Sequence, residues 1–262
     1  MIKILSFGGG VQTAALVAMS AHGEIERPDH IIFADPQAES QATYEYIAYF
    51  EAWLATRGMK VEKTTAGNIM EDALKPGLRF ASMPVYVKTE NVRGGMLTRQ
   101  CTADYKIIPV RRKLRELIGI GPRAYIAPKT VELWMGISLD EAIRMKPSRV
   151  QYIEHRYPLI EKEMTRHRCI EYLKRVGLRV PPKSACIVCP FHSDSYWRDM
   201  KRVSPAEFEA ACAFDEALRR HKSAIKKEPY LHRSLKPLRE VVFTEHPDLF
   251  GIARCDSGFC GT

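Results

Sequence analysis

The 262-residue sequence lacks any run of about 18 consecutive apolar residues, which excludes a membrane-spanning helix. It also lacks internal repeats and low-complexity stretches, so we expect a chain that folds throughout, apart from its tail. The opening Met-Ile-Lys-Ile-Leu-Ser lacks the basic and then apolar segments of an export signal. These absences predict a cytoplasmic protein with no membrane partner.

The composition is that of an ordinary globular protein, with 45% hydrophobic and 27% charged residues. Seven cysteines, an odd number, in a reducing compartment favour buried thiols, metal ligands or catalytic thiols over disulfides. A net charge of +9 favours a polyanionic partner, either a nucleic acid or the phosphates of a nucleotide.

Strand-like and helix-like patterns alternate through the first two thirds of the chain. We expect strands at 2–6, 30–34, 59–63 and 131–136, and helices at 13–19, 39–57, 104–117 and 163–176. Alternation at this pace implies parallel pairing with right-handed crossovers. The predicted fold class is α/β, a doubly wound, mostly parallel sheet.

The alternation stops beyond Pro181-Pro182. We therefore expect a nucleotide-binding α/β domain at 1–180 and a helical, cysteine-bearing C-terminal region at 181–262, with helices near 193–201 and 204–221 and a loose end from about 245. The irregular stretch at 67–100 is a candidate substrate-covering segment.

The glycine-rich turn Gly8-Gly9-Gly10 connects the first predicted strand to the first helix. Such a turn places backbone N–H groups and the positive end of a helix at one point, where phosphate can approach because side chains are missing. Ser6, Gln12 and Thr13 could add hydroxyl or amide donors. The turn fits neither the dinucleotide fingerprint Gly-x-Gly-x-x-Gly nor the Gly-Lys-Ser/Thr ending of a Walker turn.

The turn instead resembles the PP-loop, Ser-Gly-Gly-x-Asp-Ser, in the variant form Ser-Phe-Gly-Gly-Gly-Val-Gln-Thr at 6–13, with Gln12 in place of the Asp and Thr13 in place of the Ser. Three further segments resemble the PAPS reductase-like (sulfonucleotide reductase) family, in the same order along the chain: the strand ending at Asp35 and followed by Glu39, the segment 99–109 around Cys101, and the Gly-x-x-x-x-Glu-x-x-Arg segment from Gly136 to Arg144.

This resemblance implies an adenine nucleotide α-hydrolase-like fold, with the nucleotide at the carboxyl ends of the parallel strands. The implied nucleotide-binding residues are Ser6, Phe7, Gly8, Gly9, Gly10, Gln12, Thr13, Asp35, Gly136 and Arg144. Lys106, Arg111, Arg112 and Arg149 become candidate ligands for phosphate or sulfate, although each could equally belong to a solvated basic helix face. Asp35 could instead cap the following helix.

Two close pairs of cysteines predict a metal centre, Cys186 with Cys189 and Cys255 with Cys260. All four together could hold a structural zinc ion. The resemblance to cluster-bearing relatives favours a [4Fe-4S] cluster on Cys101, Cys186, Cys189 and a tail cysteine. We expect Cys169 and Cys212 to be small core residues.

The first functional hypothesis is a PP-loop ATP pyrophosphatase that uses ATP with Mg²⁺ to adenylate an acceptor for sulfur transfer, with Asp35 near the reaction and tRNA or DNA as acceptor. The alternative is an APS/PAPS reductase in which a tail thiolate, Cys260 or Cys255, attacks sulfur and releases sulfite with a thioredoxin-like partner. A third reading is a non-catalytic module that binds a nucleotide or nucleic acid. A sulfur donor and an oligomer are compatible with each enzyme.

Overall fold

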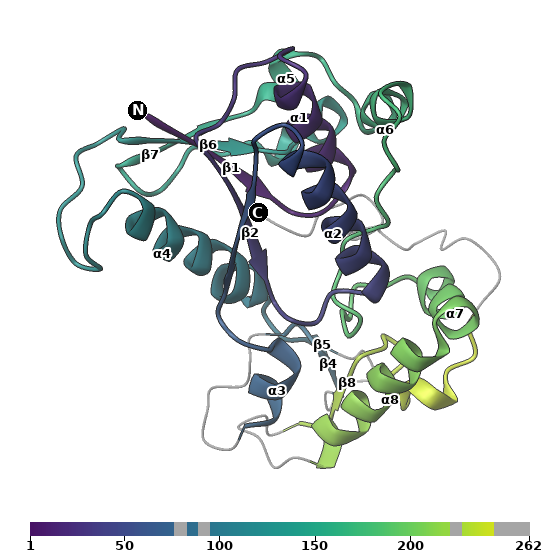
Figure 1. Ribbon diagram of the computed structural model, residues 1–262. Helices are drawn as coiled ribbons and strands as arrows, with labels where there is room; N and C mark the ends of the chain where they lie inside the picture. Colours follow the sequence, from purple (N-terminus) through teal and green to yellow (C-terminus); the bar gives the residue numbers. More distant parts are fainter. Residues whose placement is uncertain (76–82, 89–94, 221–226, 244–262) are drawn as a thin grey trace. The chain divides into compact units, whose positions relative to one another are not determined.

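A computed structural model describes residues 1–75, 83–88, 95–220 and 227–243 (Figure 1). The chain forms two compact units. The first unit comprises Met1–Asp35, Gln41–Thr65 and Ile107–Ser184, and the second comprises Pro36–Ser40, Ala66–Lys106 and Ala185–Thr262. Within the described ranges, no helix is both long enough and apolar enough to cross a membrane.

The first unit is built on a five-stranded sheet in the order β3-β2-β1-β6-β7, and all four pairings are parallel. The strands are β1 (Ile2–Phe7), β2 (His30–Asp35), β3 (Val61–Thr65), β6 (Val131–Met135) and β7 (Ile153–Arg156). The chain lays down β1, β2 and β3 in one direction and then crosses to the other side of β1 for β6 and β7. This order makes the gap between β1 and β6 the topological switch point.

Helices cover both faces of this sheet, which confirms the predicted α/β fold. The helices are α1 (Val11–Ala21), α2 (Gln41–Ala55), α4 (Ile108–Leu117), α5 (Pro158–Glu161) and α6 (Arg166–Arg175). Leu5 and Phe33 share a buried core with α1, α2 and α6, whereas Ile4 and Ile32 share another with α4. Alternate residues of each strand thus enter opposite cores, as the two-residue period of a strand requires.

Four local features of the first unit and its edge differ from the sequence-based prediction. Strand β7 and the short helix α5 were not expected, and β3 begins two residues later than predicted, at Val61. The helix predicted at 104–117 is a π-helix, Ala103–Ile107, followed by α4. Pro109 explains this change, because proline has no N–H for an α-helical hydrogen bond to residue 105 and its ring clashes with that carbonyl.

The second unit has helices α3 (Ile69–Leu74), α7 (Asp194–Val203) and α8 (Pro205–Arg220), and a three-stranded antiparallel sheet in the order β5-β4-β8. The strands of this sheet are β4 (Tyr86–Val87), β5 (Gly95–Met96) and β8 (Pro229–Tyr230). The fully buried Asp215 on α8 accepts the backbone N–H of Leu231 at 2.9 Å and that of Leu238 at 2.8 Å. Its carboxylate therefore holds β8 and the following 3-10 turn, Leu238–Glu240, against α8.

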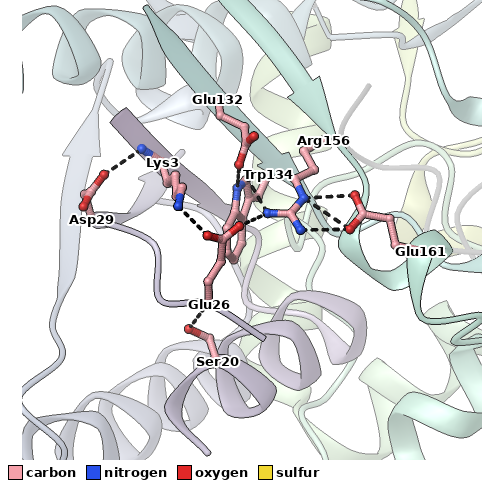
Figure 2. Close-up of polar contacts among 8 residues, drawn as sticks. All are labelled: Lys3, Ser20, Glu26, Asp29, Glu132, Trp134, Arg156 and Glu161. Atoms are coloured by element: carbon pink, nitrogen blue, oxygen red, sulfur yellow. Dashed lines mark hydrogen bonds and ion pairs between the residues drawn. The ribbon is translucent and has the colours of Figure 1, made fainter. Parts of the chain in front are cut away.

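A polar cluster links β1, β6 and β7 to the connections beside them (Figure 2). Arg156 contacts Glu26 and binds Glu161 through two nitrogens, each at 2.9 Å, and its guanidinium lies 5.0 Å from the centre of the Trp134 ring. Lys3 also contacts Glu26. Because Glu26 follows α1 and Glu161 belongs to α5, the single arginine joins three parts of the unit.

We expect Arg156→Met to lower the free energy of unfolding by about 1–3 kcal/mol, because three carboxylates, Glu26, Glu132 and Glu161, lose their shared partner. Arg202→Met is the matched control, since Arg202 is 76% exposed and, among the described residues, pairs only with the exposed Asp199 on its own helix. The control should change the stability by less than about 0.5 kcal/mol. Urea denaturation followed by circular dichroism measures both, and equal effects would contradict a stabilising role for the cluster.

Candidate nucleotide-binding site

The glycine-rich turn connects β1 to α1 at the carboxyl edge of the sheet, as predicted. Gly9 has a φ of +73°, in the left-handed region that L residues with side chains rarely adopt. A Cβ added there would also lie 3.4 Å from Ile47 Cδ1 on α2. Gly10, in contrast, is extended and has open space where its Cβ would be. Gly9 is therefore the glycine that the backbone of the turn requires.

Two hydroxyl groups fix the turn. Thr13 Oγ1 accepts the N–H of Gly8 at 3.3 Å and donates to the carbonyl of Gly10 at 3.2 Å. Ser184 Oγ donates to the carbonyl of Gly8 at 2.8 Å, although Ser184 lies 176 residues further along the chain. The turn is thus held in one conformation before any ligand arrives, which lowers the entropic cost of binding.

The end of β6 approaches the first turn of α1 closely at Gly136. A Cβ added to Gly136 would lie 2.4 Å from Thr13 Cγ2 and 3.3 Å from the Thr13 backbone. No side chain fits in this contact, so glycine is needed there. The contact brings together the carboxyl ends of β1 and β6, the two strands that flank the switch point where open α/β sheets bind ligands.

The N-terminus of α1 has the electrostatic character of an anion site. Gly10 caps the helix without a side-chain hydrogen bond, and no residue in the first turn is acidic. The first backbone N–H groups of a helix carry a partial positive charge that favours anions. This end of α1 is therefore suited to a phosphate group.

A buried network surrounds Gln12 in the first turn of α1. Its amide nitrogen donates to Glu141 Oε2 at 3.4 Å, and its amide oxygen accepts from Arg166 Nη1 at 3.0 Å. Arg144 Nη1 pairs with the same Glu141 oxygen at 2.7 Å. Burial raises the pKa of Glu141, and the positive charge of Arg144 opposes this shift.

Several predicted ligands have other roles in the structure. Phe7 is buried and stacks on Phe50 with ring centres 5.7 Å apart, so only its backbone belongs to the turn. Ser6 lies inside β1, paired with Ile32 and Met135. Arg144 is buried as the partner of Glu141. Each of these three positions thus supports the site through the core or the network.

Asp35 ends β2, the strand next to β1, and its carboxylate Oδ1 accepts a hydrogen bond from the hydroxyl of Tyr44 at 2.8 Å. Arg111 and Arg112 lie on the first half of α4, half-buried and exposed respectively. Arg149 precedes Val150, whose carbonyl accepts from the N–H of Ile153 at the start of β7. The backbone of Arg149 is therefore at the amino edge of the sheet, opposite the glycine-rich turn.

The predicted metal ligands lie in the second unit, where Cys186 and Cys189 share a tight turn. The N–H of Cys189 donates to the carbonyl of Cys186 at 3.0 Å, and His192 Nε2 lies 2.8 Å from that carbonyl oxygen. The His192 ring stacks on Tyr196 at 3.8 Å between ring centres. In the same unit, Lys106 pairs with Glu39 at 3.3 Å.

Among the described residues, no three side chains of His, Cys, Asp or Glu are grouped so that they could hold a metal ion. Cys101 lies just before the π-helix, and its role as a ligand stays a prediction. Cys255 and Cys260 lie outside the described residues, so a centre that uses them stays a prediction. Cys169 and Cys212 are core residues as expected, and burial raises the pKa of their thiols to about 12 and about 11.

Two side chains at the site, Arg166 and Ser184, were missed by the sequence reasoning. Both follow the last predicted strand, far along the chain from the glycine-rich turn, and neither belongs to a recognisable motif. Glu141 was inside a recognised segment but was not singled out. The packing of α1 against α6 brings Arg166 to Gln12, and Ser184 reaches Gly8 from the segment that follows α6.

No protein-family model and no curated protein matches the sequence. Among solved structures, the chain is similar to phosphoadenylyl-sulfate (PAPS) reductase from Candida auris in a phosphate complex, with 12% identity, a TM-score of 0.45, and coverage of 69% of this chain and 75% of that one. It is also similar to the U34-tRNA thiolase NcsA from Methanococcus maripaludis with its [4Fe-4S] cluster, with 13% identity, a TM-score of 0.38, and coverage of 86% and 74%. The α/β fold itself rests on the strand order.

The contact between Gly136 and Thr13 can be tested by adding a methyl group at position 136 and removing one at position 13. We expect Gly136→Ala to lower the free energy of unfolding by about 1–3 kcal/mol, because the new methyl overlaps Thr13 Cγ2. Thr13→Ser removes that methyl and keeps the hydroxyl, so the double variant should recover most of the loss. Urea denaturation of the two single variants and the double variant measures the coupling. Additive effects would show that the two residues do not meet.

Proposed function

We propose that this chain is a nucleotide-dependent enzyme that binds ATP at the β1–α1 turn and cleaves it between the α and β phosphates. The observation that carries the proposal is the pinned glycine turn at the switch point, which leads into a helix end with no acidic residue in its first turn. This end of α1 would receive the phosphates. Mg²⁺ would arrive with ATP, and Asp35 at the end of the adjacent strand is the candidate carboxylate for it.

In the proposed reaction, an oxygen of the acceptor attacks the α-phosphorus of ATP. The bond from the α-phosphorus to the bridging oxygen breaks, and pyrophosphate leaves with the electron pair. The acceptor carries AMP and has lost its proton to water, and a sulfur nucleophile then displaces the AMP. The protein contributes by orienting the phosphates and stabilising the charge that develops on them.

A nucleic acid is the proposed acceptor, and the net charge of +9 supports this choice. The metal centre predicted on the cysteines is separate from this step. The cluster expected from the sequence has its own test. Anaerobically purified protein that is colourless and contains zinc would contradict the iron–sulfur assignment.

The proposed reaction and its reductase alternative release different products. We expect the protein to form AMP and pyrophosphate when ATP, Mg²⁺ and bulk tRNA are supplied, because the turn is built to hold a polyphosphate. Adenylyl sulfate with a thiol reductant serves as the parallel substrate. Pyrophosphate and sulfite are measured in both reactions. Sulfite without pyrophosphate would favour the reductase and contradict the proposal.

Alanine variants of two glycines with similar φ values can distinguish a role in binding from a role in folding. Gly9 and Gly23 have φ values of +73° and +76°, but Gly23 lies in the connection after α1 and has open space around it. Alanine at either position should cost about 1–2 kcal/mol of stability through backbone strain. Only Gly9→Ala should also weaken ATP binding, measured by calorimetry on folded protein. Equal ATP affinities would remove the turn from the binding site.

A further inference from the structure

The network around Gln12 contains a cation that sequence reasoning did not assign. Arg166, the first residue of α6, donates from Nη1 to Gln12 Oε1 at 3.0 Å. Its backbone N–H is held separately by Asp140 Oδ1 at 2.9 Å. No other hydrogen bond or ion pair of the Arg166 guanidinium occurs in the described part of the chain. Its remaining N–H groups are therefore available at the first turn of α1, because the side chain is only partly buried.

An amide at position 12 suits its neighbours Glu141 and Arg166 in a way that a carboxylate would not. Gln12 donates to Glu141 and accepts from Arg166, whereas Asp, the usual PP-loop residue, could only accept. A carboxylate at this position would repel Glu141 and hold Arg166 in an ion pair. The neutral amide fixes Arg166 without neutralising its charge.

The charges of the network balance when Asp140 is counted. Arg144 and Arg166 are positive, Glu141 is negative, and the negative Asp140 carboxylate accepts the backbone N–H of Arg166 at 2.9 Å. An Asp at position 12 would make this group of side chains net negative beside a helix N-terminus, which would disfavour an anionic ligand.

The network also contains a buried oxygen atom without a hydrogen-bond partner among the described residues. Glu141 is only 5% exposed, and its second oxygen, Oε1, is buried without a hydrogen-bond partner among the described residues. An unpartnered buried carboxylate oxygen is costly for stability. This oxygen can only accept a hydrogen bond and would repel phosphate, so Glu141 is not among the proposed phosphate ligands.

We propose that Arg166 is a phosphate ligand of the nucleotide site and that Gln12 is the residue that positions it. This inference rests on the proposed function, since it assigns a ligand for the phosphates of ATP held at the β1–α1 turn. Arg166 lies on α6 and the turn on α1, and these two helices pack together in one core. The phosphates would thus be held between backbone N–H groups on one side and a guanidinium on the other.

The first test compares Arg166→Ala with Arg168→Ala. Arg168 is on the same helix, is exposed, and its guanidinium binds only the carbonyl of Glu163 in the described structure, at 3.0 Å. We expect Arg166→Ala to weaken ATP binding by about tenfold or more, the loss typical of one charge-assisted hydrogen bond, and Arg168→Ala to leave it unchanged. Adenosine, which has no phosphate, should bind all three proteins equally.

Calorimetry with ATP, inorganic pyrophosphate and adenosine gives the affinities, and thermal unfolding verifies that each variant is folded. Arg166→Lys, which keeps the charge but not the fork of donors, should fall between wild type and Arg166→Ala. Unchanged ATP affinity in Arg166→Ala, with wild type binding ATP, would overturn the inference and leave the proposed function intact. Wild type that binds neither ATP nor pyrophosphate would instead overturn the proposed function.

The positioning role of Gln12 needs a double-mutant cycle. Gln12→Ala should weaken ATP binding in the wild-type background but have little further effect beside Arg166→Ala, because it acts through that side chain. Additive losses would show that Gln12 contacts the nucleotide directly, and the positioning role would then be rejected.

Discussion

The close approach of the first turn of α1 to the end of β6 is the constraint on which the rest of the first unit depends. It requires a residue without a side chain at position 136, because Thr13 already occupies the space. It places the glycine-rich turn at the switch point of the sheet, where no crossover connection covers the strand ends. The Thr13 hydroxyl fixes the turn, while the Thr13 methyl meets Gly136. One side chain thus couples the shape of the loop to the packing of the sheet.

Electrostatics complement this geometry. The PP-loop pattern that the turn resembles has an Asp where this chain has Gln12, so the chain lacks a negative charge there. The structure gives a physical reason for this difference. The amide lies between a buried carboxylate and a guanidinium, and as a neutral group it donates to the first and accepts from the second. Position 12 has no acidic side chain, but the neighbouring Glu141 is acidic and pairs with Arg144. The positive end of α1 consequently faces no uncompensated negative charge within this network.

The second unit has its own core and its own small sheet, and it contains Cys101, Cys186 and Cys189. Cys186 and Cys189 share a tight turn, and their role as ligands of one centre stays a prediction. The Asp215 contacts show a different use of a buried charge. Two backbone N–H groups and Arg219 satisfy that carboxylate, so it organises the chain around α8.

The sequence by itself determined the alternation of strands and helices, the parallel α/β fold, the phosphate-type turn and the core positions of Cys169 and Cys212. These features depend on periodicity, glycine content and local chemistry, which act over a few residues. Only the tertiary structure decided that Arg144 pairs with Glu141, that Arg149 lies at the far edge of the sheet, and that Ser184 and Arg166 reach the turn. The contacts of Ser184 and Arg166 join residues more than 100 positions apart, and the place of Arg149 depends on which end of a strand its loop joins. Arg144 and Glu141 are only three residues apart, but the burial that makes them pair is set by the surrounding fold. Periodicity fixes which face of a strand is buried, but it does not fix what the fold places opposite it.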